Sequence, residues 1–492
     1  MDSADVTGIW LPDEILLRIL SSLEDSLPQS FNKDVKERKV FNKTLCNACL
    51  ASKRLGRLAQ TVLYRRIDAR SRSLTITMLN SPHLCGMVRE LYCPFQKKSA
   101  NSFGLVSLRN FLRVLWNLKC TKHDPNWLKD TSLPGSNTSG THTFSEPEVR
   151  GYRYDLVVSC WLYLLPSLKS ITIGVANDMP VLPDLIRFYL EKMPHRLSQL
   201  ATIDLRASSD DKLSFIEPAL ILFQLPFLKN VTIYDVAYVV ASGNTGNIGR
   251  TFDTPAEACQ KLEWVKADFT WITPESLKIM LSSCKSLRFL DIKIKTMSRT
   301  RCDPFRYHLG EWLQNCHALE NLKIDIRASR RWTDGSEGSR EIQEQTWVRE
   351  NLGSLQGLTK LKRLSLTVEF QLLTMPRTKD LPFVPIPLSL DFVNILPTSI
   401  REFEVRKLSI LDYDSFVDSV YRLAESERLT NLYSVVMFFG LELARDVKHL
   451  GWKVRVDGSF CFDMLHEGRR GWPEIPYQVK PSSTYTYRYG RV

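Results

Sequence analysis

The sequence predicts an α/β protein in which a short helical unit is followed by a curved solenoid of parallel strands and returning helices. Two patterns carry this prediction. One is an apolar template that recurs along most of the chain, and the other is an amphipathic helical pattern confined to residues 11–67. Composition agrees with both, because 43% hydrophobic and 24% charged residues are ordinary values for a folded chain with a core.

The helical unit begins at Leu11. Pro12 suits the first position of a helix, where its missing N–H costs no hydrogen bond, and the two acidic residues after it complement the helix dipole. Apolar residues then recur at helical spacing on one face: Leu11, Ile15, Ile19, Leu20 and Leu23. After a polar stretch at 24–43, residues 44–67 predict two short helices that separate at Ser52, a favourable N-cap residue for the second.

The apolar template occupies positions n, n+3, n+6 and n+8. It is found at 85–93, 165–173, 197–205, 225–233, 259–267, 284–292, 316–324, 358–366, 397–405 and 429–437. Its last two positions alternate, as in a short strand with one buried face, and helical patterns lie between neighbouring copies. One strand and one returning helix per period is the plan of a leucine-rich repeat. From residue 165 the period varies between 25 and 42 residues, so the repeats are expected to be degenerate, with inserted loops.

The two patterns divide the chain into three parts. We predict the helical unit at 1–70, the leucine-rich-repeat-like solenoid at 71–456, and a C-terminal cap or tail at 457–492. Segments rich in Ser, Thr, Gly or Pro are predicted to be loops inserted into the solenoid: about 121–150, 241–256 and 371–390.

Charge and cysteine content narrow the location of the protein. The net charge of +12 permits a polyanionic partner, but the basic residues are spread along the chain rather than gathered in runs. The N-terminal residues lack the basic segment of a secretory signal, and no apolar stretch reaches the ~20 residues that span a bilayer. Because 11 scattered cysteines favour reduced thiols, we expect a cytoplasmic or nuclear protein without a membrane segment.

No pattern indicates a catalytic or metal site. Cys46 and Cys49 have the spacing of half a zinc site, but no second pair exists and both lie in an apolar helical pattern, which favours a place in the core. The sequence lacks phosphate-binding, metalloprotease and nucleophile-elbow motifs. We therefore expect a non-catalytic protein with no metal and no cofactor.

The helical unit resembles an F-box of the kind common in fungal proteins. The matching pieces are the opening LPDEI, the spacing of Leu45 and Leu50, the turn SKRL and the closing LYRRI, and they span about 57 of the 492 residues. The resemblance implies a substrate-recognition subunit of an SCF-type (Skp–cullin–F-box) ubiquitin ligase. In such a complex the F-box binds a Skp-type adaptor, and through it a cullin scaffold, while the repeats hold a target protein for ubiquitination.

A helical unit of this size cannot bury all of its leucines by itself. We therefore expect it to expose an apolar surface that binds the adaptor. The residues expected to form this surface are Leu11, Pro12, Ile15, Ile19 and Leu50.

The repeats predict a second surface. If the template positions are buried, then positions n+5, n+7 and n+9 line the open face of the sheet. The residues expected to bind the substrate there are Trp264, Lys266, Phe289, Lys293 and Lys323. Aromatic rings among charges of both signs favour a protein partner over a nucleic acid. An alternative has equal support from the sequence: the inserted loops cover the two rings, which then belong to the core.

Two other functions also fit the sequence. In one, an adaptor-bound F-box protein acts as a scaffold outside the ligase. In the other, the basic solenoid binds nucleic acid, as the charge of +12 would allow. The sequence does not identify the target protein under any of these hypotheses.

Overall fold

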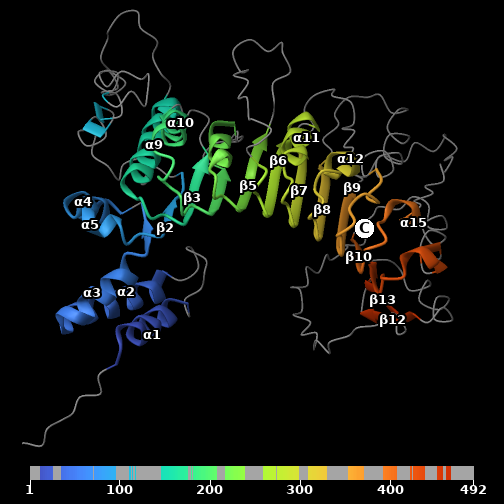
Figure 1. The fold of residues 1–492 in the computed structure, drawn as a ribbon, viewed down its shortest axis with the longest axis horizontal. Helices are drawn as coiled ribbons and strands as arrows, with labels where there is room; N and C mark the ends of the chain where they lie inside the picture. Colours follow the sequence, from blue (N-terminus) through green and yellow to red (C-terminus); the bar gives the residue numbers. More distant parts are fainter. Residues whose placement is uncertain are drawn as a thin grey trace, which may run out of the picture.

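The computed structural model describes much of the chain, and Figure 1 shows these parts as ribbons. The described residues are 11–25, 35–69, 71–95, 110–111, 113–114, 117, 146–175, 179, 181–207, 217–238, 259–272, 274–297, 309–329, 353–370, 392–406, 422–423, 425–437, 452–457 and 461–466. The predicted loops at 241–256 and 371–390 lie outside them, as do most of the predicted loop at 121–150 and the end of the predicted tail.

Across the described residues, one open sheet of 13 strands organises the fold. Strands β1 to β11 are parallel and follow one another in chain order, and β13 and β12 complete the sheet in antiparallel pairing. The strands are β1 Arg66–Asp68, β2 Glu90–Cys93, β3 Ser170–Val175, β4 Thr202–Ala207, β5 Asn230–Tyr238, β6 Trp264–Ile272, β7 Phe289–Met297, β8 Asn321–Ser329, β9 Arg363–Phe370, β10 Glu402–Arg406, β11 Ser434–Met437, β12 Trp452–Asp457 and β13 Cys461–His466.

Among the described residues, helices connect most pairs of successive parallel strands and lie along one side of the sheet (Figure 1). They are α4 Arg72–Asn80, α5 Pro82–Cys85, α9 Glu146–Leu164, α10 Val181–Lys192, the 3-10 helix η1 Glu217–Gln224, α11 Pro274–Ser282, α12 Leu309–Leu313, α15 Phe392–Ile395 and the 3-10 helix η3 Glu427–Leu429. The three helices of the N-terminal unit precede β1: α1 Asp13–Asp25, α2 Val35–Ala51 and α3 Lys53–Leu63. No helix among the described residues is long and apolar enough to cross a membrane.

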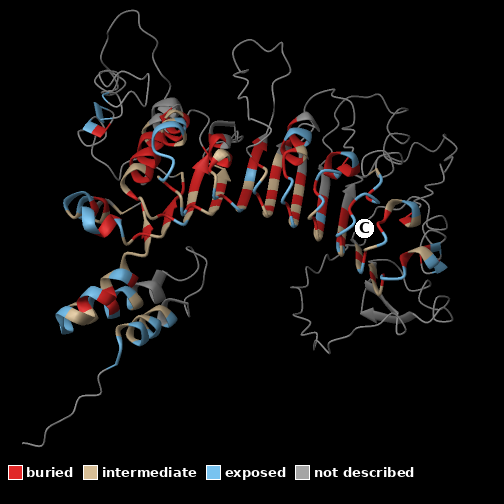
Figure 2. Cartoon of the chain, viewed as in Figure 1, coloured by how far each residue is buried: buried red, intermediate tan, exposed pale blue. Residues whose placement is uncertain are grey.

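The apolar template ends in a strand at each of its ten positions, which confirms the predicted parallel strands. The register brings equivalent positions together. Leu290 pairs with Val265 on one side and Leu322 on the other, and Ile292 pairs with Ala267 and Ile324. These template residues are buried in one continuous core between the sheet and the helices (Figure 2).

Several element boundaries differ from the prediction. Helix α2 begins at Val35 rather than at Thr44, so part of the polar stretch is helical. The end of the predicted second short helix is strand β1, because Ile67 is buried against the sheet and residues 66–68 pair with β2. Helix α9 begins at Glu146, inside the segment predicted to be a loop up to residue 150. The predicted cap contributes β13 to the sheet, so the sheet extends beyond residue 456.

Two buried polar side chains fix α9 against the sheet and the next helix. The Tyr154 hydroxyl donates to the Cys93 carbonyl and accepts a hydrogen bond of 2.7 Å from the Gly174 N–H, which ties α9 to β2 and β3. The Asp155 carboxyl accepts hydrogen bonds from the first N–H groups of α10, at 2.6 Å from Val181 and 2.9 Å from Leu182. Burial raises the pKa of Asp155 to about 8. The carboxyl therefore acts as a remote cap for a helix end that would otherwise have unpaired donors.

A row of ion pairs follows template position n+4, one residue before each strand begins. Lys229 Nζ lies 2.7 Å from Glu263 Oε1. Further along the sheet, Glu320 is held from both sides, at 2.7 Å from Arg288 Nη2 and 2.8 Å from Lys362 Nζ. Hydrogen bonds from Lys362 and Arg288 lower the pKa of Glu320 from 4.5 to about 2. Each ion pair therefore joins two neighbouring units through the residues that directly precede their strands.

A charge introduced at a core position should unfold the sheet, whereas the same charge one residue earlier should not. Leu322 is 2% exposed, while its neighbour Asn321 points to the opposite face and is half-buried. We expect Leu322→Asp to lower the free energy of unfolding by about 4 kcal/mol or more, because an unpaired carboxylate enters a packed core. Urea denaturation monitored by circular dichroism measures the loss. Asn321→Asp is the control, and equal stability of the two variants would contradict the assignment of the buried face.

The ion pairs of Glu320 with Arg288 and Lys362 predict a specific pH dependence of the free energy of unfolding. A carboxylate whose folded pKa lies near 2 instead of 4.5 stabilises the fold above pH 4.5, and this contribution is lost as the pH falls toward 2. We therefore expect Glu320→Gln to be less stable than the parent chain at about pH 7, with the difference narrowing toward about pH 3. Glu311, which has no ion pair among the described residues, supplies the control substitution Glu311→Gln. A difference for Glu320→Gln that stays constant with pH would contradict the prediction.

Candidate functional site

The three N-terminal helices share a very small core of their own. Its fully buried members are Leu45 of α2 and Ala59 and Val62 of α3, and residues of α1 such as Leu17 and Leu20 pack against them while partly exposed. Ser52 caps α3 as the sequence predicts, since its hydroxyl accepts a hydrogen bond of 3.1 Å from the Leu55 N–H. A core of this size leaves much apolar surface of the helices uncovered.

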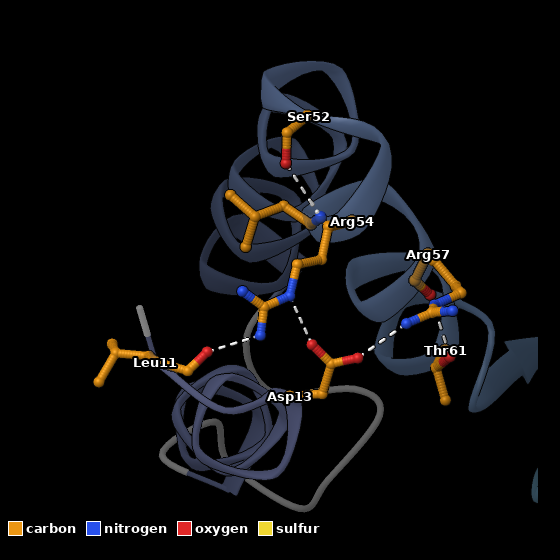
Figure 3. A network of polar contacts seen from close by, with 7 residues as sticks. Leu11, Asp13, Ser52, Arg54, Arg57 and Thr61 are labelled. Atoms are coloured by element: carbon orange, nitrogen blue, oxygen red, sulfur yellow. Dashed lines mark hydrogen bonds and ion pairs between the residues drawn. The ribbon is translucent and has the colours of Figure 1, made fainter. Parts of the chain in front are cut away.

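A polar network holds the start of α1 against α3 (Figure 3). Asp13 Oδ1 lies 2.6 Å from Arg54 Nε, and Asp13 Oδ2 lies 2.7 Å from Arg57 Nη2. Arg54 also donates to the Leu11 carbonyl at 2.6 Å. The hydrogen bond from Arg54 is the main reason why the pKa of Asp13 is lowered. The acidic residue of LPDEI and the arginine of SKRL are therefore direct partners, a contact that the sequence pattern alone did not reveal.

The residues predicted to bind the adaptor are all exposed. The exposed fractions are 38% for Leu11, 42% for Ile15, 47% for Ile19 and 85% for Leu50, and Pro12 is also exposed. Ile15 and Ile19 lie four residues apart on one face of α1, and Leu11 lies two residues before the helix begins. These three residues are called the apolar stripe of α1 below. Exposed apolar side chains gathered in this way typically mark a surface that another molecule covers.

Among the described residues of the helical unit, one further large exposed apolar residue is not predicted by the sequence. Val40 on α2 is 66% exposed. It lies in the polar stretch at 24–43, where a mixed run of charged residues shows no clear helical periodicity of apolar residues. Together with Leu50, Val40 shows that α2 exposes apolar surface as well as α1.

The open face of the sheet brings the two predicted aromatic residues into direct contact. Trp264 of β6 and Phe289 of β7 are register partners, and their rings stack at a centroid distance of 5.3 Å and an angle of 11°. Both side chains are half-buried, and neither belongs to the core cluster. The pair therefore presents a flat apolar surface at the start of two neighbouring strands.

The predicted lysines alternate with aspartates on adjacent strands. Lys293 Nζ lies 3.4 Å from Asp268 Oδ2, and Lys323 Nζ lies 3.7 Å from Asp291 Oδ2. Lys266 is the register partner of Asp291 on the other side. Lys323 is exposed, whereas Lys266 and Lys293 are half-buried. Because each lysine has an aspartate beside it, the face carries mixed charges with no strong field of one sign.

An arginine between two tyrosines continues this face toward the N-terminal strands. The Arg206 guanidinium of β4 lies 5.2 Å from the ring centre of Tyr234 and 5.9 Å from that of Tyr92. Asp204 contacts the same guanidinium at 2.9 Å. Tyr92 is almost fully buried and lies on a strand two places away, so only the sheet order could reveal its contact with Arg206.

The paired cysteines of α2 differ from the prediction. Cys46 is exposed and Cys49 is half-buried, so the expectation that both lie in the core is wrong for Cys46. The reason is that Cys46 directly follows the buried Leu45, and adjacent residues of a helix point in different directions. Among the described residues, no group of three or more His, Cys, Asp and Glu side chains is placed to hold a metal ion.

No protein-family model matches the sequence, and no curated protein matches it either. The interpretation of the two surfaces therefore depends on their own geometry and on the resemblance of residues 11–67 to an F-box.

Proposed function

We propose that the chain is a non-catalytic substrate-recognition subunit of an SCF-type ubiquitin ligase. Helices α1 to α3 form an F-box that binds a Skp-type adaptor and, through it, a cullin scaffold. The strand–helix units that follow are degenerate leucine-rich repeats stacked into a curved solenoid. Their open face binds a target protein and holds its lysines near the ubiquitin-conjugating enzyme, which accelerates transfer by proximity.

The exposed apolar stripe of α1 is the observation that carries this proposal. Leu11, Ile15 and Ile19 are exposed although the unit has few buried apolar residues of its own. The contacts of Asp13 with Arg54 and Arg57 fix the helix that carries the stripe. A fixed apolar stripe on a small helical unit is what a helical adaptor can cover, because association then removes this surface from water.

The open face supports the second half of the proposal. The stacked rings of Trp264 and Phe289 offer an apolar anchor, and the paired charges around them offer hydrogen-bonding groups of both signs. Aromatic anchors with a polar surround are typical of protein-binding surfaces. A nucleic-acid groove would instead need basic side chains that are free of acidic neighbours.

The adaptor surface can be removed without disturbing the helix. In the variant Ile15→Glu with Ile19→Lys, the new side chains are spaced to attract each other along the helix. We expect this double variant to lose co-purification with a Skp-type adaptor while its thermal unfolding stays close to that of the parent. Ile279→Lys is the matched control, because Ile279 is 37% exposed on α11 in the repeats. Retained adaptor binding in the double variant would refute the F-box assignment.

The same purification separates the alternatives. A cullin recovered with the adaptor supports the ligase, whereas an adaptor complex without cullin supports a scaffold that acts outside it. Binding to DNA or RNA that weakens steeply with added salt would instead favour the nucleic-acid hypothesis.

The substrate surface is tested by removing the stacked rings. Aromatic anchors typically contribute ~2 kcal/mol or more when they are truncated in an interface. We therefore expect Trp264→Ala with Phe289→Ala to lower recovery of the target proteins by about tenfold or more, while the adaptor is recovered normally. Affinity purification with quantitative mass spectrometry measures both quantities in one sample.

Phe227→Ala is the control for the loss of an aromatic side chain, because Phe227 is 51% exposed in the turn before β5. If the double variant unfolds, the rings serve the core, as the alternative interpretation of the sequence holds. If it folds and recovers every partner normally, the target binds elsewhere on the chain.

A further inference from the structure

A polar pocket lies outside the two surfaces described above. It has a volume of about 260 Å³ and lies at the starts of the strands β8 to β11, beside the row of ion pairs. Its cationic side chains are Lys360, Lys362 and Arg401, and its one carboxylate is Glu320. No residue that lines it is apolar. Three cations and one carboxylate leave two positive charges in excess.

The carboxylate in this pocket is already fully engaged. Glu320 Oε1 accepts from Arg288 at 2.7 Å, and Oε2 accepts from Lys362 at 2.8 Å. Lys360 and Arg401 are exposed and form no ion pair among the described residues. The excess positive charge is therefore located on these two side chains, which come from two successive units of the sheet.

The polar walls of the pocket are held in place by the turns that carry them. The Ser399 hydroxyl donates to the carbonyls of Leu358 and Leu361, at 3.3 and 2.9 Å. The Asn431 amide donates to the Thr398 carbonyl at 3.0 Å. These bonds join the turns before β9, β10 and β11, so the cations project from a framework that needs little reorganisation to bind a ligand.

We propose that this pocket binds a phosphate monoester group. Its volume is below the ~300 Å³ at which pockets begin to accommodate drug-sized ligands, so it suits a single small group. A guanidinium fork together with an ammonium point charge is a donor set that recognises phosphate. A monoester carries about −1.5 to −2 charges at neutral pH, which matches the excess of two positive charges. A carboxylate or a phosphodiester carries about one charge and would leave a cation unpaired.

The experiment uses the full chain and three probes: O-phosphoserine, acetate and a short peptide that contains one phosphoserine. We expect O-phosphoserine to bind in isothermal titration, acetate to bind about tenfold more weakly or not at all, and Lys360→Ala with Arg401→Ala to weaken phosphoserine binding about tenfold or more. The control is Lys261→Ala with Lys285→Ala. Both residues are exposed, and Lys261 has the template position n+2 that Lys360 has in its own unit.

The two phosphate probes, O-phosphoserine and the phosphoserine peptide, show which kind of molecule carries the phosphate group that the pocket binds. Tighter binding of the peptide than of O-phosphoserine places the group on a protein, and equal affinities place it on a free small molecule. Equal weakening in the two double variants would show that only the overall charge matters and would overturn the proposal. Absence of binding by either phosphate probe to the parent chain, with its fold confirmed by circular dichroism, would overturn it as well.

Discussion

The parallel register of the strands decides which side chains enter the core and which form each surface of the sheet. From β6 to β10 each strand pairs with the next without a shift, so that equivalent template positions lie side by side. A slip of one residue would turn Leu290 and Leu322 to the open face and bring charged residues into the core. From β6 to β9 both strand positions of the template are buried in each unit, which excludes that slip. The sheet therefore has one register over its central part, and each row of side chains across it has a fixed composition.

The chemistry of each surface follows from these rows. Position n+5 contributes the stacked Trp264 and Phe289, and positions n+7 and n+9 contribute lysines and aspartates that face each other across strands. The open face is therefore apolar at one point and nearly neutral around it. The row at n+4 differs, because its acidic residues Glu263 and Glu320 are already paired with cations of neighbouring units. Arg401 is left without an acidic partner among the described residues, which makes one edge of a largely neutral sheet locally positive.

Periodic features, such as the strands, could be predicted from the sequence. Contacts between residues that are distant in the sequence could not. Alternating apolar positions identified the strands from β2 to β11, because one buried face per strand leaves a visible period of two. Strand β1 was missed because its three residues are too few to show a period. The hydrogen bond from Val181 to Asp155 joins α10 directly to α9, although β3 separates these helices in the sequence, so only the folded chain reveals it. In the candidate site, exposure of Ile15 and Ile19 followed from the size of the unit, whereas the contact between Asp13 and Arg54 required the packing angle of α1 on α3.

The junction between the helical unit and the sheet bears on the proposed function. Helix α3 ends at Leu63 and β1 begins at Arg66, so only Tyr64 and Arg65 separate them. The Arg65 carbonyl accepts hydrogen bonds from Arg89 at 2.8 Å and Glu90 at 2.9 Å, which fixes the connection as part of the sheet. A flexible linker would let a bound target sample many positions relative to an adaptor on α1, and the effective concentration of its lysines at the conjugating enzyme would fall. The short, hydrogen-bonded connection instead favours one fixed orientation of the two surfaces, which is what a recognition subunit that acts by proximity alone requires.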